Sequence, residues 1–223
     1  MKKERKNSMK PPVLLTVVRV VCVLMPIFLS ACLPQSSPPK PFYYYTLDYP
    51  SPEVRLGSQL PVVLRVERFS VSPPFNSQRI YYSDKGPYRN AYAHHQWIAA
   101  PSDLLPFLIA RDLRDTHAFH GILTPDTALV ATHMLSGWVE EFLELDHDSA
   151  WQASLRLNIT LIAAQDPDPS RRILLQKTYT AKAPSNEKTP AGLARAMSVA
   201  TAEVSCNIIQ DVYKTLAEHS TPR

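Results

Sequence analysis

Glycine and cysteine are scarce in this sequence. Its 223 residues include 5 glycines and 3 cysteines, against 21 prolines. Loops that cradle phosphate groups need several closely spaced glycines, so the scarcity of glycine argues against a nucleotide-binding loop. The hydrophobic fraction of 45% and the charged fraction of 20% are ordinary for a globular protein. They exclude a low-complexity disordered chain, a collagen-like chain and a membrane protein with several spans.

The positive charge of the sequence is concentrated at its N-terminus. The formal net charge is +4, from 24 basic and 20 acidic residues, and the isoelectric point is near 8.9. The first ten residues contain Lys2, Lys3, Arg5, Lys6 and Lys10. An apolar run follows from Val13 to Leu29, and its stretch after Arg19 is shorter than the ~20 residues that span a bilayer. This arrangement is typical of a secretory signal rather than of a spanning helix.

The apolar run ends in Leu29-Ser30-Ala31-Cys32, which resembles the lipobox of bacterial lipoproteins. In such proteins the signal is cleaved before the cysteine, the thiol receives a diacylglycerol, and the new amino group is acylated. We therefore expect a lipoprotein signal peptide over residues 1–31 and covalent lipid on Cys32; the alternative is a chance cysteine after an ordinary signal. Leu33 replaces the aspartate that favours inner-membrane retention in enterobacterial lipoproteins. This favours the periplasmic face of the outer membrane over the inner membrane.

Cleavage would change the charge of the chain. Removal of 31 of the 223 residues leaves 192 residues, with six basic residues and one acidic residue lost. The remaining 18 basic and 19 acidic residues give a net charge of −1. A nearly neutral exported domain is not expected to bind nucleic acid. Cys206 would be the remaining free thiol, so no intramolecular disulfide is expected, and its apolar neighbours predict that it is buried.

The mature chain is expected to begin with a tether and to continue as one folded domain. Residues 32–41 are rich in proline and predict a lipidated tether of about 25–30 Å when extended. Residues 42–219 carry patterns typical of strands. These patterns cover residues 42–47, 60–71, 80–82, 88–97, 119–123, 133–145, 150–164 and 171–182.

Two amphipathic helices complete the predicted domain. The first covers residues 102–116 with Ser102 or Asp103 as its cap, and Pro106 is placed in its first turn. The second begins after a cap at Thr189 and presents a continuous apolar stripe as far as Leu216. The expected fold class is α+β: a single domain with a mostly antiparallel β-sheet packed by two main α-helices.

The titratable residues do not form a recognisable catalytic or metal-binding motif. His94 and His95 are adjacent in a predicted strand and would point to opposite faces. Glu140 and Glu144 would share one face of a strand, where exposure to solvent explains them without catalysis. The sequence has no Gly-x-Ser-x-Gly motif. We therefore expect no enzyme, no metal site and no cofactor other than the lipid on Cys32.

Tyrosine is concentrated in the N-terminal half of the mature chain. The residues are Tyr43, Tyr44, Tyr45, Tyr49, Tyr81, Tyr82, Tyr88 and Tyr92. Packing within strands explains such an enrichment, because tyrosine is favoured there. A contact surface is the alternative, because a tyrosine side chain offers a large amphipathic area at a low entropy cost.

Several short segments occur in an order that is typical of one family. They are Tyr44-Tyr45-Thr46-Leu47, Arg65-Val66-Glu67, Gln78 to Tyr82, Tyr92, Trp97 and Pro101, followed by a leucine-rich helix. In these features the chain resembles the ABC-type transport auxiliary lipoproteins, the PqiC-like family, over residues 42–215. Between Trp97 and Pro101 the chain has Ile98-Ala99-Ala100, where the family more usually has Ala-Glu.

The resemblance implies a membrane-anchored lipoprotein of an envelope transport system. Its partners would be an ABC permease and ATPase and an MCE-domain protein, which move lipids or other hydrophobic cargo between membranes. The domain would dock these partners without chemistry, as a possible ring-shaped homo-oligomer, through its long helix and tyrosine-bearing strands. Two alternatives stay open: a periplasmic carrier that binds lipid itself, and a scaffold lipoprotein of another envelope assembly machine.

Overall fold

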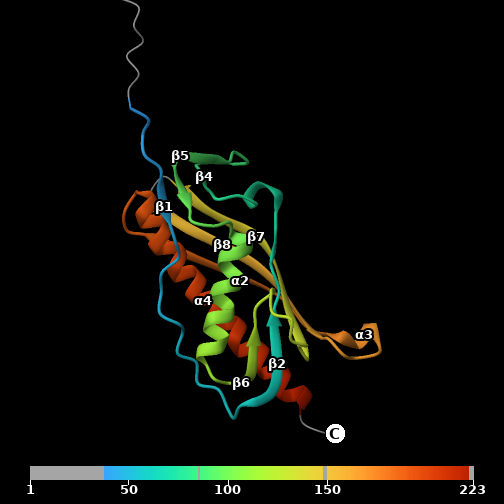
Figure 1. The fold of residues 1–223 in the computed structure, drawn as a ribbon. Coiled ribbons are helices and arrows are strands. Elements are labelled where there is room, and N and C mark those ends of the chain that lie inside the picture. The colour runs from blue at the N-terminus through green and yellow to red at the C-terminus, as the bar shows by residue number, and fades with distance from the viewer. Residues whose placement is uncertain (1–37, 85, 148–149, 221–223) are drawn as a thin grey trace, which may run out of the picture. The chain divides into compact units, whose positions relative to one another are not determined.

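The alternating apolar pattern of the chain produces one large sheet with helices on it (Figure 1). The computed structural model describes residues 38–84, 86–147 and 150–220, and the folded domain begins at Pro41. Its helices are α2 (Pro101–Asp115), α3 (Pro169–Arg172) and α4 (Pro190–Ser220), with a 3₁₀ turn η2 at Pro73–Phe75. Its strands are β1 (Tyr43–Tyr45), β2 (Leu60–Val66), β3 (Ser70–Val71), β4 (Arg79–Ser83), β5 (Asn90–Trp97), β6 (Phe119–Leu123), β7 (His133–His147), β8 (Ala150–Ala163) and β9 (Ile173–Ser185).

The three longest strands form an antiparallel meander, as the sequence predicts. β7 pairs with β8 from His133 opposite Ala163 to His147 opposite Ala150, and β8 pairs with β9. Val139 lies opposite Leu157, and both are fully buried. The period-two apolar pattern of β8 therefore places its large side chains on the face that the helices cover.

The prediction of a mostly antiparallel sheet is wrong, because the other edge of β7 is parallel. β7 is long enough to pair in succession with β2, β3 and β4, all three in parallel. β1 with β5 and β2 with β6 are also parallel. Of the eight pairings between described strands, five are parallel and three antiparallel, so the sheet is mixed. Side-chain alternation reveals a strand but not the direction of its neighbour.

The predicted strand over residues 60–71 is divided in two. β2 ends at Val66 and β3 begins at Ser70, with Phe69 buried between them. The Phe69 ring lies over Gly137, where a Cβ atom would come within 2.8 Å of the ring. Glycine at this position of β7 therefore leaves the space into which Phe69 packs.

Both long helices cover one face of the sheet (Figure 1). α4 packs on β8 and β9, and α2 packs beside it against β6, β7 and β2. The predicted apolar stripe of α4 is confirmed as buried: Leu193, Met197, Val204, Ile208, Val212 and Leu216. The hydroxyl of Thr189 accepts a hydrogen bond from the backbone N–H of Gly192 at 3.0 Å, so this residue caps the helix as predicted.

The start of α2 differs from the prediction. The helix begins at Pro101 after Ala100, and no side chain caps it. Pro106 therefore lies beyond the first turn and cannot donate to the carbonyl of Ser102. The backbone N–H of Phe69 donates to that carbonyl instead, at 3.4 Å. A segment outside the helix thus satisfies the group that the proline leaves unpaired.

Candidate functional site

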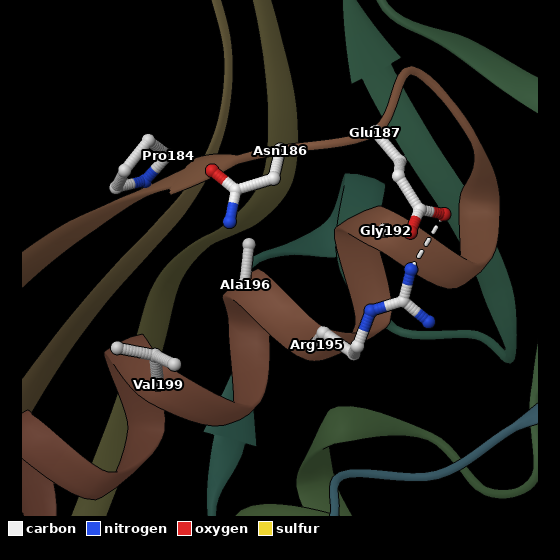
Figure 2. Close-up of a pocket in the computed structure, with 7 residues that line it drawn as sticks. All are labelled: Pro184, Asn186, Glu187, Gly192, Arg195, Ala196 and Val199. Carbon is white, nitrogen blue, oxygen red and sulfur yellow. Dashed lines mark ion pairs between the residues drawn. The ribbon is translucent and has the colours of Figure 1, made fainter.

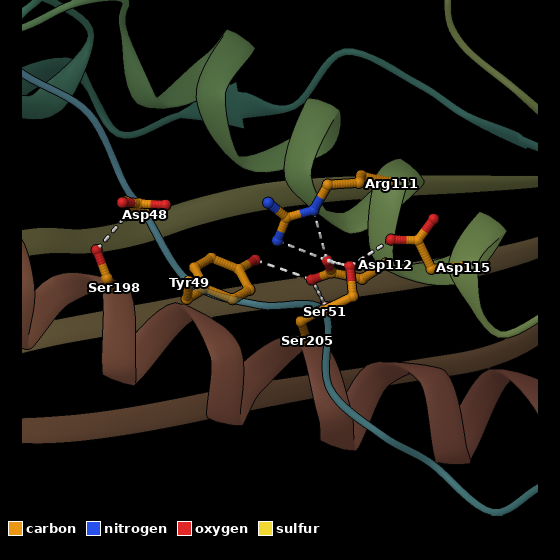
Figure 3. Close-up of polar contacts among 8 residues, drawn as sticks. All are labelled: Asp48, Tyr49, Ser51, Arg111, Asp112, Asp115, Ser198 and Ser205. Atoms are coloured by element: carbon orange, nitrogen blue, oxygen red, sulfur yellow. Dashed lines mark hydrogen bonds and ion pairs between the residues drawn. The ribbon is translucent and has the colours of Figure 1, made fainter.

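A buried carboxylate joins three segments that lie far apart in the sequence (Figure 3). Asp112 of α2 is fully buried. It accepts hydrogen bonds from the hydroxyls of Tyr49 at 2.8 Å and Ser205 at 2.5 Å. Ser51 donates to its other oxygen at 3.1 Å, and Arg111 pairs with that same oxygen at 2.8 Å. Because these donors occupy both oxygens, the carboxylate joins α2 to α4 and to the segment after β1 that carries Tyr49 and Ser51.

The electrostatics around Asp112 agree with this structural role. Burial and the neighbouring carboxylate of Asp112 raise the pKa of Tyr49, so its hydroxyl stays protonated as a donor. The guanidinium of Arg111 lies over the Tyr49 ring, 4.6 Å from its centroid. Asp112 was not among the residues expected to form a site. A signal was present, because it follows Leu105 by seven residues in an apolar helical pattern and so occupies a core position.

Tyrosine and histidine rings pack together where β1 meets β5. The Tyr43 ring stacks on His95 with centroids 5.2 Å apart and an interplanar angle of 16°. The Tyr45 hydroxyl lies 2.9 Å from Nδ1 of His95, and the Tyr92 ring meets the same imidazole edge-on at 5.9 Å. His94 contacts the Phe42 ring instead, at 5.6 Å. The two histidines thus have separate aromatic partners.

A second buried carboxylate lies beside this cluster. Glu144 is fully buried, and the Tyr92 hydroxyl donates to it at 3.0 Å. Burial is the largest cause of its altered ionisation, and it raises the pKa of Glu144 to about 7. The prediction that Glu140 and Glu144 share a solvated face is wrong. A bulge between Val139 and Glu141 shifts the alternation of β7 and turns Glu144 inward, whereas Glu140 pairs with exposed Arg156 at 2.8 Å.

Four aromatic side chains at this end of the domain are exposed. The exposed fractions are 49% for Phe42, 53% for Tyr43, 60% for Tyr44 and 72% for Tyr88. We call these four residues the aromatic end. The other tyrosines are divided: Tyr49 is buried with Asp112, whereas Tyr82 and Tyr92 pack against each other with centroids 5.0 Å apart. Packing within the domain therefore explains Tyr49, Tyr82 and Tyr92, whereas a contact surface stays a prediction for the exposed residues.

A small hollow lies where β9 turns into α4 (Figure 2). Its volume is about 120 Å³. Two of its lining residues, Glu187 of the turn and Arg195 of the helix, form an ion pair at 2.6 Å, drawn as a dashed line in Figure 2. Val199, one turn further along α4, is 61% exposed. Gly192 is required beside the hollow, because a Cβ atom there would lie 2.3 Å from the carbonyl oxygen of Glu187. The hollow is smaller than the 300–1,000 Å³ typical of small-molecule sites.

The histidines are dispersed over the described part of the domain. Within that part, no three histidine, cysteine, aspartate or glutamate side chains are close enough to hold a metal ion. His133 has a pKa lowered by burial and, to a smaller extent, by His219. The described helices are also too short or too polar to cross a bilayer.

Of the two cysteines in the predicted mature chain, Cys206 lies among the described residues and Cys32 does not. Cys32 and the signal peptide over residues 1–31 lie outside the described residues, so the lipidation of Cys32 stays a prediction. Cys206 is a free thiol on α4 and is half-buried rather than buried. It lies one position after Ser205, which faces Asp112, so it sits at the margin of the buried stripe.

The described residues include a buried hydrogen-bond network around Asp112 and a set of exposed apolar side chains. The model of the ABC-type transport auxiliary lipoprotein component family matches residues 45–209, most of the chain. The protein therefore belongs to this family, and the resemblance inferred from the sequence is confirmed.

Solved structures share the fold at low sequence identity. Protein XCC0632 from Xanthomonas campestris is 19% identical, with a TM-score of 0.66 over 81% of this chain and 96% of that one. The crystal structure of an uncharacterized protein is 14% identical, with a TM-score of 0.58 over 78% of this chain and 99% of that one. These similarities show the fold alone. No curated protein matches the chain at a significant level.

Proposed function

We propose that this protein is a lipid-anchored docking component of an ABC transport system that moves lipids between membranes. Lipid on Cys32 would hold it at the periplasmic face of the outer membrane. The folded domain would bind an MCE-domain protein that works with the ABC permease and ATPase. The domain would carry out no chemistry and would use no cofactor. A ring of several copies is part of this proposal.

The observation that carries the proposal is the order of features along the chain. A lipobox ends at Cys32, a tether of about ten residues follows, and the family match begins at residue 45. Two or three acyl chains anchor a protein durably, since each buried CH₂ group contributes about 0.8 kcal/mol. A domain attached in this way stays at the membrane while it binds a partner in the periplasm.

The exposed face of α4 is the docking surface that we propose for the protein partner. Val199 is a large apolar residue on a helix whose opposite side is buried in the core. The hollow beside it, bounded by the ion pair of Glu187 and Arg195, has room for an apolar side chain of a partner. A partner side chain that filled this hollow and covered Val199 would remove apolar surface from water, which favours binding.

Acyl labelling in cells tests the anchor. We expect an alkyne-bearing palmitate to label the wild-type protein and not the Cys32→Ala variant, because the thiol and the new amine of Cys32 are the attachment points. Cys206→Ala is the matched control, and it should keep full labelling because Cys206 is a free thiol of α4. Unchanged labelling of Cys32→Ala would contradict the anchor.

Photo-crosslinking in cells tests the docking. A benzophenone amino acid at Val199 should capture an MCE-domain protein. The same amino acid at Trp138, 52% exposed on β7, should not, because Val139 beside it points to the helix-covered face and Trp138 points away. Capture of components of an unrelated envelope machine would favour the scaffold alternative, and capture of no MCE protein would refute the proposal.

A further inference from the structure

We propose that the aromatic end, Phe42, Tyr43, Tyr44 and Tyr88, rests in the headgroup layer of the membrane that holds the lipid anchor. The inference rests on the proposed anchoring at Cys32. It adds a second contact between the protein and the bilayer, made by the folded domain itself. This contact would fix which end of the domain faces the membrane.

The direction of β1 places the aromatic side chains at the point where the tether enters. β1 runs parallel to β5, with Tyr43 opposite His95 and Tyr45 opposite Trp97. The residues before Tyr43 therefore run toward the N-terminal end of β5, which follows the loop that carries Tyr88. Figure 1 shows β1, β4 and β5 at the same end of the domain. The chain thus reaches the aromatic end before any other part of the fold.

The length of the tether limits how far this end can lie from the bilayer. Phe42 lies ten positions after Cys32 in the sequence. At ~3.1 Å per residue in a polyproline II conformation, a proline-rich segment of this length covers about 30 Å, and a fully extended one reaches about 35 Å at most. A surface held this close to a bilayer meets it at a high effective concentration, and a weak affinity is enough for contact.

The chemistry of the side chains suits the headgroup layer. Tyrosine rings combine an apolar ring with a polar hydroxyl and are enriched where hydrocarbon meets water. The Tyr43 ring is held by stacking on His95, and the Phe42 ring by its edge contact with His94. Because these contacts limit the rotamers in advance, insertion costs less side-chain entropy.

The backbone of β1 also favours headgroups over the hydrocarbon core. β1 ends the order of the sheet, so its outer edge pairs with no other described strand. Unpaired N–H and C=O groups are costly in hydrocarbon. Phosphate, carbonyl and water groups of the headgroup layer satisfy them, and contact with a bilayer also keeps the edge from pairing with another chain.

Photo-crosslinking of the reconstituted lipoprotein tests the inference. The acylated full-length mature protein is placed in vesicles of phosphatidylethanolamine and phosphatidylglycerol, with a benzophenone amino acid at Tyr44, at Tyr88 or at Trp138. We expect phospholipid adducts, identified by mass spectrometry, at Tyr44 and Tyr88 and at least roughly tenfold fewer at Trp138. Adducts with a second copy, or no lipid adducts at Tyr44 and Tyr88, would overturn the inference.

The anchor is measured in the same samples, so that the two proposals fail separately. If the mass of the protein shows acyl chains on Cys32 and Tyr44 gives no lipid adduct, the anchor holds and the contact is refuted. If Cys32 carries no acyl chain, the anchoring proposal fails. In the wild type, vesicles should protect Lys40 from an amine-reactive reagent. A double variant, Tyr44→Ser with Tyr88→Ser, should keep its acyl chains but lose this protection of Lys40. Equal protection in both proteins would also contradict the contact.

Discussion

Asp112 is the residue with the clearest energetic role in this domain. It is fully buried and receives hydrogen bonds from Tyr49, Ser51 and Ser205. We expect Asp112→Ala to lower the free energy of unfolding by on the order of 3 kcal/mol, because several buried donors lose their acceptor. Denaturant unfolding of the purified wild type and variant measures this difference in the free energy of unfolding.

Asp103→Ala is the control for this substitution. Asp103 also pairs with an arginine, Arg68, at 3.2 Å, but both side chains are well exposed. Exposed ion pairs contribute about 0–1 kcal/mol, so this variant should unfold almost as the wild type does. Equal losses for both variants would show that burial of Asp112 has no special importance.

The buried carboxyl of Glu144 should make the stability of the folded protein fall as the pH rises. Its pKa is raised from 4.5 to about 7 in the folded state, so the folded protein binds this proton more tightly than the unfolded chain does. The contribution to stability is therefore complete below pH 4.5 and is lost as the pH rises toward 7, by up to about 3 kcal/mol.

The Glu144→Gln variant isolates this effect. Its unfolding free energy should change less than that of the wild type between pH 5 and 8, and it should be the more stable protein at pH 8. Glu140→Gln should keep the wild-type profile, because Glu140 lies at the surface beside Arg156. Parallel pH profiles for the wild type and Glu144→Gln would contradict the inward position of Glu144.

At the scale of elements, Gly137 of β7 predicts a local packing effect. A methyl group there would lie 2.8 Å from the Phe69 ring, so Gly137→Ala should displace the ring and cost roughly 1–3 kcal/mol. Gly121→Ala in β6 is the matched strand control, since its methyl group would have ordinary contacts with Val63 at 3.7 Å. Thermal unfolding compares the two, and an unfolding temperature for Gly137→Ala at or above that of Gly121→Ala would refute the packing argument.

The sequence predicts individual strands and helices better than it predicts how the strands pair. Period-two patterns located β7, β8 and β9, and the helical stripe with its Thr189 cap located α4. The parallel edge of β7 was not predictable, because it depends on which strands meet across 60 or more residues. The buried position of the Glu144 side chain depends on one bulge in β7, and no local residue pattern predicts that bulge. The partner of the Ser102 carbonyl, Phe69, is likewise a tertiary contact.

The candidate surfaces were predictable only in outline. The tyrosine content left strand packing and a contact surface both open, and the sequence did not separate Tyr44, which is exposed, from Tyr49, which is buried with Asp112. That division depends on the parallel pairing of β1 with β5, which presents Tyr43 and Tyr44 at an open edge. Asp112 could have been found from its core position in the helical pattern, whereas Glu144 could not.

At the scale of the whole molecule, docking and lipid carriage make different demands on the core. A carrier needs an apolar cavity long enough for acyl chains, whereas a docking domain needs a rigid surface. Here α2 and α4 fill the inner face of the sheet, and the side chains of Leu105, Leu157 and Met197 are fully buried between them. The acyl chains that we expect in this protein are therefore those attached to Cys32.

Native mass spectrometry distinguishes these two functions. The Cys32→Ala protein should have the mass of its polypeptide alone, because the side chains of α2 and α4 cover the inner face of the described sheet. The acylated wild type should carry the mass of its own polypeptide and of the covalent lipid, and nothing further. A phospholipid that stays bound to the Cys32→Ala protein and exchanges with added lipid would require the helices to part from the sheet. That result would favour a carrier over a docking component, even if the crosslink at Val199 captured an MCE protein.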